Sequence, residues 1–188
     1  MRKRKIKVSE KEKNARSRVH LMTESAMIAA LYVAATLLLA PISYGPIQFR
    51  VSEALTMLPV CSSTSTVGLT IGCAIANAVG VAMGVNSCGV ADILFGTAAT
   101  LLAAVTTRVL RSVTVSRAKL PILSALMPPL FNGLIVGFEL SYFFKLPFWL
   151  CALQVAGGEL AVTLLLGLPL VVAVRKIGLF GQEGLSSR

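Results

Sequence analysis

The sequence predicts an all-α integral membrane protein, a six-transmembrane-helix bundle with both termini in the cytoplasm. Hydrophobic residues make up 55% of the 188 residues and charged residues only 14%, whereas roughly 25% are charged in a typical soluble domain. The apolar residues form one block, residues 21–174, which has room for about six spans of ~20 residues joined by short connections. Lysine and arginine cluster outside this block.

The distribution of charge argues for a membrane topology and against nucleic-acid binding. The net charge of +10 and the isoelectric point near 10.0 would by themselves suit a nucleic-acid-binding protein. However, nine Lys and Arg residues stand among the first eighteen, ahead of the apolar block. We therefore expect a basic cytoplasmic arm (1–20), a membrane domain that binds substrate (21–176) and a short cytoplasmic tail (177–188). A signal peptide has a similar beginning, but further apolar segments follow at once, which favours an uncleaved first helix.

Six apolar segments can be placed within the block. The second is the weakest, because it contains Glu53 and is interrupted by Pro59. Pro128 and Pro129 are expected to kink the fifth. The predicted spans are residues 24–42, 51–66, 67–85, 91–110, 120–143 and 147–174.

Basic residues in the short connections predict the orientation, because they are enriched on the cytoplasmic side. With the N-terminus inside, the external connections carry only Arg50 and Lys145. The connection between the fourth and fifth spans is cytoplasmic and contains Arg108, Arg111, Arg117 and Lys119. The even number of spans agrees with this bias, and we expect a multi-pass protein of the bacterial plasma membrane with both termini inside.

The sequence gives no indication of an enzyme. It contains no G-x-x-x-x-G-K-[ST] phosphate loop, so the chain is not expected to hydrolyse ATP itself. The four cysteines show no C-x-x-C spacing and His20 is the single histidine, so neither a metal site nor a disulfide framework is expected. We expect no catalytic residue, no metal and no cofactor, and interpret the cysteines as small buried apolar residues.

Polar side chains inside the apolar block form a candidate substrate site. A charge at the bilayer centre costs at least ~2.5–3.5 kcal/mol, so it normally faces protein, water or a ligand. In the predicted topology, acids of four spans lie toward the outer half of the membrane, where with amides and aromatic rings they would suit a small planar polar solute. The candidate substrate-binding residues are Glu139, Glu159, Asn77, Asn132, Asp92, Glu53 and Arg50, and the candidate stacking residues are Phe49, Phe131, Tyr142, Phe148 and Trp149.

Structural interpretations of the same residues compete with this one. Arg50 and Glu53 stand three apart and could form an ion pair on one helix. Asp92 could cap the fourth helix, and the two asparagines could hydrogen-bond between helices. The aromatic residues near span ends could form an interfacial belt. Glu139 and Glu159 are harder to explain in structural terms, because each interrupts an otherwise apolar helix.

The first span carries a row of small residues, with Ala26, Ala30 and Ala34 at intervals of four. Small residues at this spacing form a smooth ridge that another helix can approach closely. The ridge could serve packing inside the bundle, or it could be the docking face for a second membrane subunit.

Several stretches resemble a known family. Residues 41–55, P-I-S-Y-G-P-I-Q-F-R-V-S-E-A-L, are similar to the signature of QueT-type substrate-binding S components of energy-coupling factor (ECF) transporters. I-G-C-A-I-A-N around Asn77, D-I-L-F-G-T-A-A-T-L-L-A-A from Asp92 and P-P-L-F-N-G-L-I-V-G before Glu139 follow in the same order, as does the final P-F-W-L…G-E-L…G-L-P-L. The resemblance covers residues 26–176.

The resemblance implies a six-helix S component that binds a queuosine precursor, a 7-deazaguanine such as queuine or preQ1, from outside. It also implies an EcfT-type coupling subunit and two cytoplasmic ATPases as partners, and assigns the alanine ridge to docking of the coupling subunit. Two alternatives remain: an S component for a different vitamin or nucleobase, and a self-contained secondary carrier. The second is disfavoured, because the six spans show no inverted repeat of broken helices.

Overall fold

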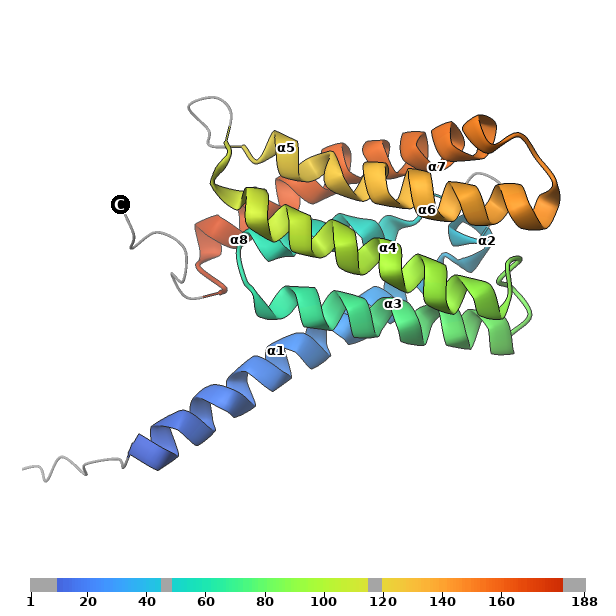
Figure 1. Ribbon diagram of the computed structural model, residues 1–188. Coiled ribbons are helices and arrows are strands. Elements are labelled where there is room, and N and C mark those ends of the chain that lie inside the picture. The colour runs from blue at the N-terminus through green and yellow to red at the C-terminus, as the bar shows by residue number, and fades with distance from the viewer. Residues whose placement is uncertain (1–9, 45–48, 115–119, 181–188) are drawn as a thin grey trace, which may run out of the picture.

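A computed structural model of the chain describes residues 10–44, 49–114 and 120–180 (Figure 1). Over these residues the regular structure is helical and contains no strand. The elements are α1 (Glu10–Leu38), α2 (Ala40–Ser43), η1 (Val51–Val60), α3 (Thr64–Ala82), α4 (Val90–Val109), η2 (Leu110–Ser112), α5 (Ile122–Ala125), α6 (Met127–Phe144), α7 (Phe148–Val162), η3 (Thr163–Gly167) and α8 (Leu168–Ile177).

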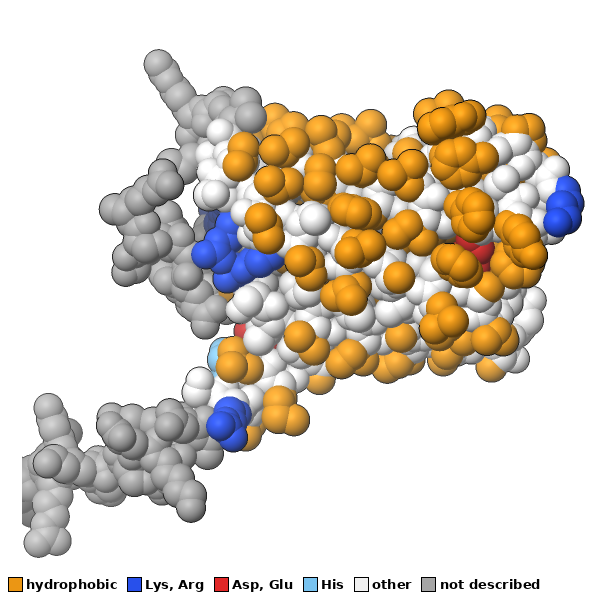
Figure 2. All heavy atoms as spheres, viewed as in Figure 1, with side chains coloured by type: hydrophobic (Ala, Val, Ile, Leu, Met, Phe, Trp, Pro, Cys, Tyr) orange, Lys and Arg blue, Asp and Glu red, His pale blue; other side chains and the backbone are white. Residues whose placement is uncertain are grey.

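Five helical stretches in the described residues are long and apolar enough to cross a membrane, and η1 is a shorter apolar helix. The stretches are Ser17–Leu38, Thr64–Ala82, Val90–Ser112, Ile122–Phe144 and Phe148–Ile177. The predicted all-α membrane bundle is therefore confirmed. Figure 2 shows hydrophobic side chains over much of the surface between the two ends of the bundle, where lipid would contact it.

The second predicted span, residues 51–66, has the wrong boundaries. In its place the structure has η1, a ten-residue 3₁₀ helix that ends at Val60, followed by α3, which begins at Thr64. At the ~2.0 Å rise of a 3₁₀ helix, ten residues extend ~20 Å. Eight of the ten are buried, and η1 packs against α1, α3, α4, α8 and η3. Because it is enclosed by protein rather than lipid, its polar residues and irregular backbone are tolerated at this depth.

Prolines and a π-helical turn interrupt three other predicted spans. The first helix ends at Leu38, before Pro41, and short α2 follows. The break between α5 and α6 falls at Leu126, just before Pro128 and Pro129, where a kink was expected. The last span is continuous from α7 to α8 but passes through η3, a π-helical turn. The first helix also starts much earlier than predicted, so α1 runs through residue 20, the predicted boundary of the basic arm.

The start of α1 and the end of α8 lie at the same end of the bundle (Figure 1). Figure 2 shows basic side chains gathered at that end, and Arg108 near the end of α4 and Arg175 and Lys176 near the end of α8 contribute to them. Lys145 follows α6, which ends at the opposite side. The end of the bundle where α1 begins and α8 ends is the one that the distribution of Lys and Arg assigns to the cytoplasm.

Small residues allow neighbouring helices to approach closely. A Cβ atom added at Gly137 of α6 would lie 2.6 Å from Cα of Ala152 in α7, and one added at Gly72 of α3 would lie 3.0 Å from Cα of Ala29 in α1. In lipid the hydrophobic effect does not drive helices together, so such close packing is a main source of helix association.

We predict that Gly137→Ala lowers the stability of the bundle by about 1–3 kcal/mol, because the backbone of α7 would have to move to admit one methyl group. Gly157→Ala is the matched control, since an added Cβ there meets nothing within 4 Å. Thermal unfolding of the detergent-purified protein measures both. Equal midpoints for the two variants would contradict the close packing of α6 on α7.

Candidate substrate-binding site

All seven residues predicted to bind substrate are buried, although they come from five elements. Arg50 directly precedes η1 and Glu53 lies in it, Asn77 is in α3, and Asp92 is in α4. Asn132 and Glu139 are in α6 and Glu159 is in α7. The tertiary structure therefore encloses all of these polar side chains within the protein.

We call these seven residues, together with the polar side chains that contact them, the polar cluster. Asp92 is the centre of one part of it. Its Oδ2 atom is 3.3 Å from Nη2 of Arg50 and accepts a hydrogen bond of 2.8 Å from Nδ2 of Asn86. Its backbone oxygen accepts a hydrogen bond of 2.8 Å from Nδ2 of Asn77. Arg50 thus pairs with Asp92 rather than with Glu53, three residues away, and Asp92 engages side chains instead of capping the N-terminus of α4.

Glu53 is the centre of the other part. Its Oε1 atom accepts hydrogen bonds from the hydroxyl groups of Tyr32 and Thr100. Asn132 lies close enough to interact with the carboxylates of both Glu53 and Glu159. This part therefore joins α1, η1, α4, α6 and α7 around two carboxylates.

Glu139 and Glu159 have few partners for buried acids. Glu139 is 1% exposed and neither of its carboxylate oxygens accepts a hydrogen bond, although Asp92 lies nearby. Glu159 is 2% exposed, and its Oε2 atom has no partner. A buried polar atom without a partner costs ~1–3 kcal/mol, and more when the group is charged. The hydrogen bonds of Glu139 and Glu159 therefore do not explain why two acids are buried here.

The unpartnered atoms of the cluster are mostly acceptors. The acceptor oxygens without a partner are Glu53 Oε2, Asp92 Oδ1, both Oε atoms of Glu139, Glu159 Oε2 and Asn77 Oδ1. The unpartnered donors are Arg50 Nε and Asn132 Nδ2. Since carboxylates accept and cannot donate when ionised, the cluster as it stands would best be satisfied by a molecule rich in N–H donors or positively charged.

Gly96 of α4 gives this cluster room. A Cβ atom there would lie 2.5 Å from Oδ1 of Asp92 and 2.7 Å from Nδ2 of Asn77. A side chain at position 96 would therefore occupy the space between two polar groups of the cluster.

Two buried tyrosines that contact the cluster were not among the residues predicted to stack on a ligand. Tyr142 and Trp149 are 62% and 69% exposed, so for these two the interfacial interpretation fits better than a place in the cluster. Instead, Tyr32 and Tyr44 are buried, and the guanidinium carbon of Arg50 lies 5.5 Å from the ring centroid of Tyr44. Burial, the largest cause, raises the pKa of Tyr44 to about 12, so its hydroxyl stays protonated and donates to the backbone oxygen of Ala76.

Four residues of the cluster were missed by sequence reasoning: Tyr32, Tyr44, Asn86 and Thr100. Tyr44 lies inside the motif P-I-S-Y-G-P, and Tyr32 faces away from the alanine ridge, which are signals that the sequence contains. Asn86 and Thr100 carry no comparable signal, because uncharged polar residues are common at span ends and within transmembrane helices.

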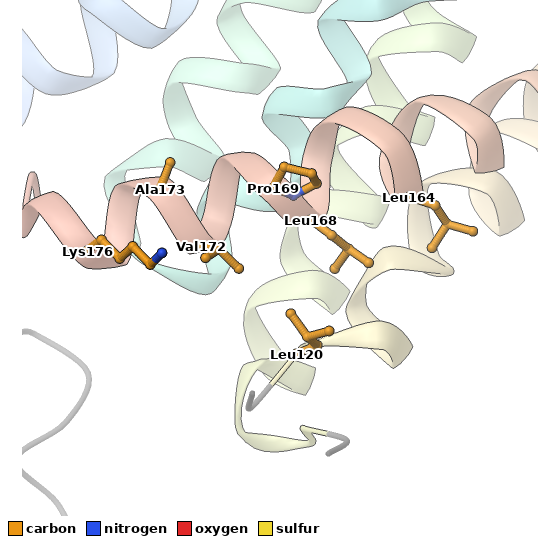
Figure 3. A pocket seen from close by; sticks show the side chains of 7 residues that line it. All are labelled: Leu120, Leu164, Leu168, Pro169, Val172, Ala173 and Lys176. Carbon is orange, nitrogen blue, oxygen red and sulfur yellow. The ribbon is translucent and has the colours of Figure 1, made fainter. Parts of the chain in front are cut away.

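An apolar groove on the surface is a separate feature. It has a volume of about 470 Å³ and lies between α8 and Leu120 (Figure 3). Its lining is apolar except for Lys176. None of its residues belongs to the polar cluster, and its lining offers almost nothing to orient a polar solute.

The fold and the cluster together define a multi-pass helical membrane protein with polar side chains enclosed between its helices. The model of the QueT transporter family matches residues 22–176, which is most of the chain. The chain belongs to the QueT transporter family, as the sequence motifs indicated, and this family is one of transporters rather than enzymes.

One curated relative shares part of the sequence. The queuosine precursor transporter QueT of Lactococcus lactis subsp. cremoris (strain MG1363) is 44% identical over 64 residues, which are 33% of this chain and 38% of the relative. The similarity thus spans less than two fifths of the relative's length. No solved structure matches the chain.

We predict that Arg50→Met destabilises the ligand-free protein by about 3–5 kcal/mol, because it leaves Asp92 buried without its cationic partner. The double variant Arg50→Met/Asp92→Asn should lose less than the sum of the two single variants. Arg18→Met, the same change at an exposed position of α1, is the control and should shift stability by no more than ~0.5 kcal/mol. Thermal unfolding in detergent measures all four variants, and additive losses would contradict a direct pair.

Proposed function

We propose that the chain is the substrate-binding subunit of an ECF-type importer for a queuosine precursor, a 7-deazaguanine such as preQ1 or queuine. It takes the solute from outside and moves it inward together with an EcfT-type coupling subunit and two cytoplasmic ATPases. The observation that supports this most is the excess of unpartnered acceptor oxygens in a buried cluster of a QueT-family chain.

The chemistry of a deazaguanine matches this excess. Its ring N–H and exocyclic amine are donors on one edge of the base, and one carboxylate can accept both together. preQ1 adds an aminomethyl cation, which calls for a second carboxylate. The carbonyl oxygen of the base needs a donor. Nδ2 of Asn132 and Nε of Arg50 are donors that have no hydrogen-bond partner within the protein.

The arrangement suggests a role for each acid. Glu139 and Glu159 accept from the donor edge or the cation, since their oxygens lack partners. Asn77 and Asn132 orient the base. Glu53, Asp92 and Arg50 support the site through their existing contacts. A ligand without matching donors would leave these buried acceptors unsatisfied, and this is the basis of selectivity.

The position of the alanine ridge supports a partner subunit. Ala26, Ala30 and Ala34 are all exposed on α1, whereas Ile28 and Tyr32 of the same helix are buried in the bundle. The ridge is therefore not used for packing within this chain, and a helix of the coupling subunit can approach it closely.

We predict that calorimetry of the purified protein detects binding of preQ1 and queuine, and weaker binding of guanine, a purine that has a nitrogen where the deazaguanines carry their side group. Glu139→Gln and Glu159→Gln should each weaken preQ1 binding about 10–100-fold, since a hydrogen bond to a charged group contributes ~1.5–3 kcal/mol.

Glu24→Gln is the matched control, because Glu24 contacts Ser62 and Thr64, outside the cluster, and its loss should leave the affinity unchanged. Absence of binding to all three ligands would refute the substrate. Binding of another vitamin or base would assign the chain to a different S component. Uptake into liposomes without ATPases, driven by a proton gradient, would show a secondary carrier instead.

We predict that Ala30→Leu abolishes co-purification with the coupling subunit while preQ1 binding persists, because the larger side chain keeps the partner helix away. Ala98→Leu is the control, since Ala98 is exposed on α4, away from the ridge. Survival of the complex with Ala30→Leu would show that the ridge is not the docking face.

A further inference from the structure

The apolar groove along α8 has a charged residue at one end (Figure 3). Side chains at intervals of four residues form one wall of it, because this spacing places them on one face of a helix. They are Leu164, Leu168, Val172 and Lys176. Leu120 lies opposite Leu168 (Figure 3). The groove is therefore a hollow of about 470 Å³ between apolar side chains, with a cation at one end.

The length of the groove corresponds to one leaflet of a bilayer. Leu164 and Lys176 are twelve residues apart, which is ~18 Å at the ~1.5 Å rise of a helix. The hydrocarbon core of a bilayer is ~30 Å thick, so one leaflet contributes ~15 Å of it. Lys176 lies near the end of α8, at the end of the bundle assigned to the cytoplasm. The groove therefore extends from the level of the cytoplasmic headgroups to about the middle of the bilayer.

Lys176 is the cation that the groove presents to the membrane. Its side chain is exposed, and its methylene groups can lie along the apolar wall while the ammonium group reaches the headgroups. No carboxylate in the described part of the chain forms an ion pair with Lys176. Neighbouring Arg175 instead lies close enough to Cys61, which follows η1, to interact with its thiol. A negatively charged headgroup would therefore meet Lys176 at the end of the groove.

The lining favours a lipid over a transmembrane helix of another chain. Helices approach one another most closely over small residues, but Ala173 is the one small side chain that lines this groove. A flexible acyl chain can fill an irregular hollow between leucine and valine side chains. Basic residues on the cytoplasmic side of transmembrane helices attract anionic headgroups. The length, the apolar lining and the terminal cation are together the features that an anionic phospholipid complements.

A second apolar groove offers a comparison without charge. It has a volume of about 370 Å³, lies between α6 and α7, and has no charged residue in its lining. An acyl chain could lie there, but nothing in the lining would select a headgroup. The two grooves therefore separate the contribution of the cation from that of the apolar walls.

We propose that the groove along α8 is a binding site for an anionic phospholipid of the cytoplasmic leaflet. The phosphate lies beside Lys176, and one acyl chain follows α8 toward η3. A lipid that binds only the folded chain also stabilises it by mass action. The site is independent of the proposed transport function, because none of its residues belongs to the polar cluster.

Native mass spectrometry of the full chain, released from detergent micelles, tests the role of the cation. Phosphatidylglycerol is compared with phosphatidylcholine of the same acyl chains, and we predict that the chain retains one phosphatidylglycerol several-fold more tightly. Lys176→Gln should weaken this binding about fivefold, which corresponds to the ~1 kcal/mol that one basic residue contributes near an anionic surface. Lys176→Arg should keep the affinity. Arg18→Gln, at an exposed position of α1, is the control and should leave it unchanged.

Filling each groove tests the place of the acyl chain. Ala173 is exposed on α8, and Ala173→Leu should weaken the retention of phosphatidylglycerol several-fold, because the added side chain occupies the groove. Gly157→Leu is the matched control. It places the same side chain in the second groove, at a position where an added Cβ atom meets nothing within 4 Å, and should leave the retention of phosphatidylglycerol unchanged.

The contrary outcomes are equally definite. Equal retention of the two lipids, or equal losses for Lys176→Gln and Arg18→Gln, overturns the site, because binding would then not depend on a cation in the groove. Equal effects of Ala173→Leu and Gly157→Leu overturn the place of the acyl chain. If Ala173→Leu leaves lipid retention unchanged but dissociates a dimer in size-exclusion chromatography, a second copy of the chain occupies the groove instead. Failure to bind preQ1 would count against the proposed function alone.

Discussion

Charged groups are costly to hold inside a membrane, and this cost shapes the arrangement of the helices. The carboxylates of Glu53, Asp92, Glu139 and Glu159 and the guanidinium of Arg50 lie within the apolar block, and each is almost completely shielded from solvent. In a bilayer such groups must face protein, water or a ligand. The helices are arranged accordingly: α3, α4 and α7 contact η1, and α6 packs against α4 and α7. On the face of the bundle seen in Figure 2, hydrophobic side chains are spread over the surface between its two ends.

The short helix η1 is possible only because of this enclosure. A segment with Ser52, Glu53, Thr56 and Pro59 would be a poor lipid-facing span, since each unsatisfied polar group in hydrocarbon costs several kcal/mol. Surrounded by other helices, the same segment brings Glu53 into contact with Tyr32 and Thr100. The weakest span of the sequence is therefore the most enclosed element of the fold.

The contacts within the cluster distinguish acids that stabilise the fold from acids that are available to bind a solute. Asp92 has three polar partners in Arg50, Asn86 and Asn77, so structural stabilisation accounts for much of its environment. Glu139 has no hydrogen-bond partner and Glu159 has an unpartnered oxygen, and stabilisation does not account for either. A single arginine beside Asp92 leaves the cluster rich in acceptors, which is the property that a donor-rich solute would complement.

The membrane class, the helical bundle, the family and the buried polar residues could be predicted from the sequence, because hydropathy and charge leave a direct pattern along the chain. It also indicated the alanine ridge, since a spacing of four residues places side chains on one helix face. Contacts between distant helices were needed to establish that Arg50 pairs with Asp92, that Tyr32 and not Trp149 lies in the cluster, and that the ridge faces outward. These depend on which helix faces meet across long separations in the chain, and periodicity within one helix cannot specify its neighbour.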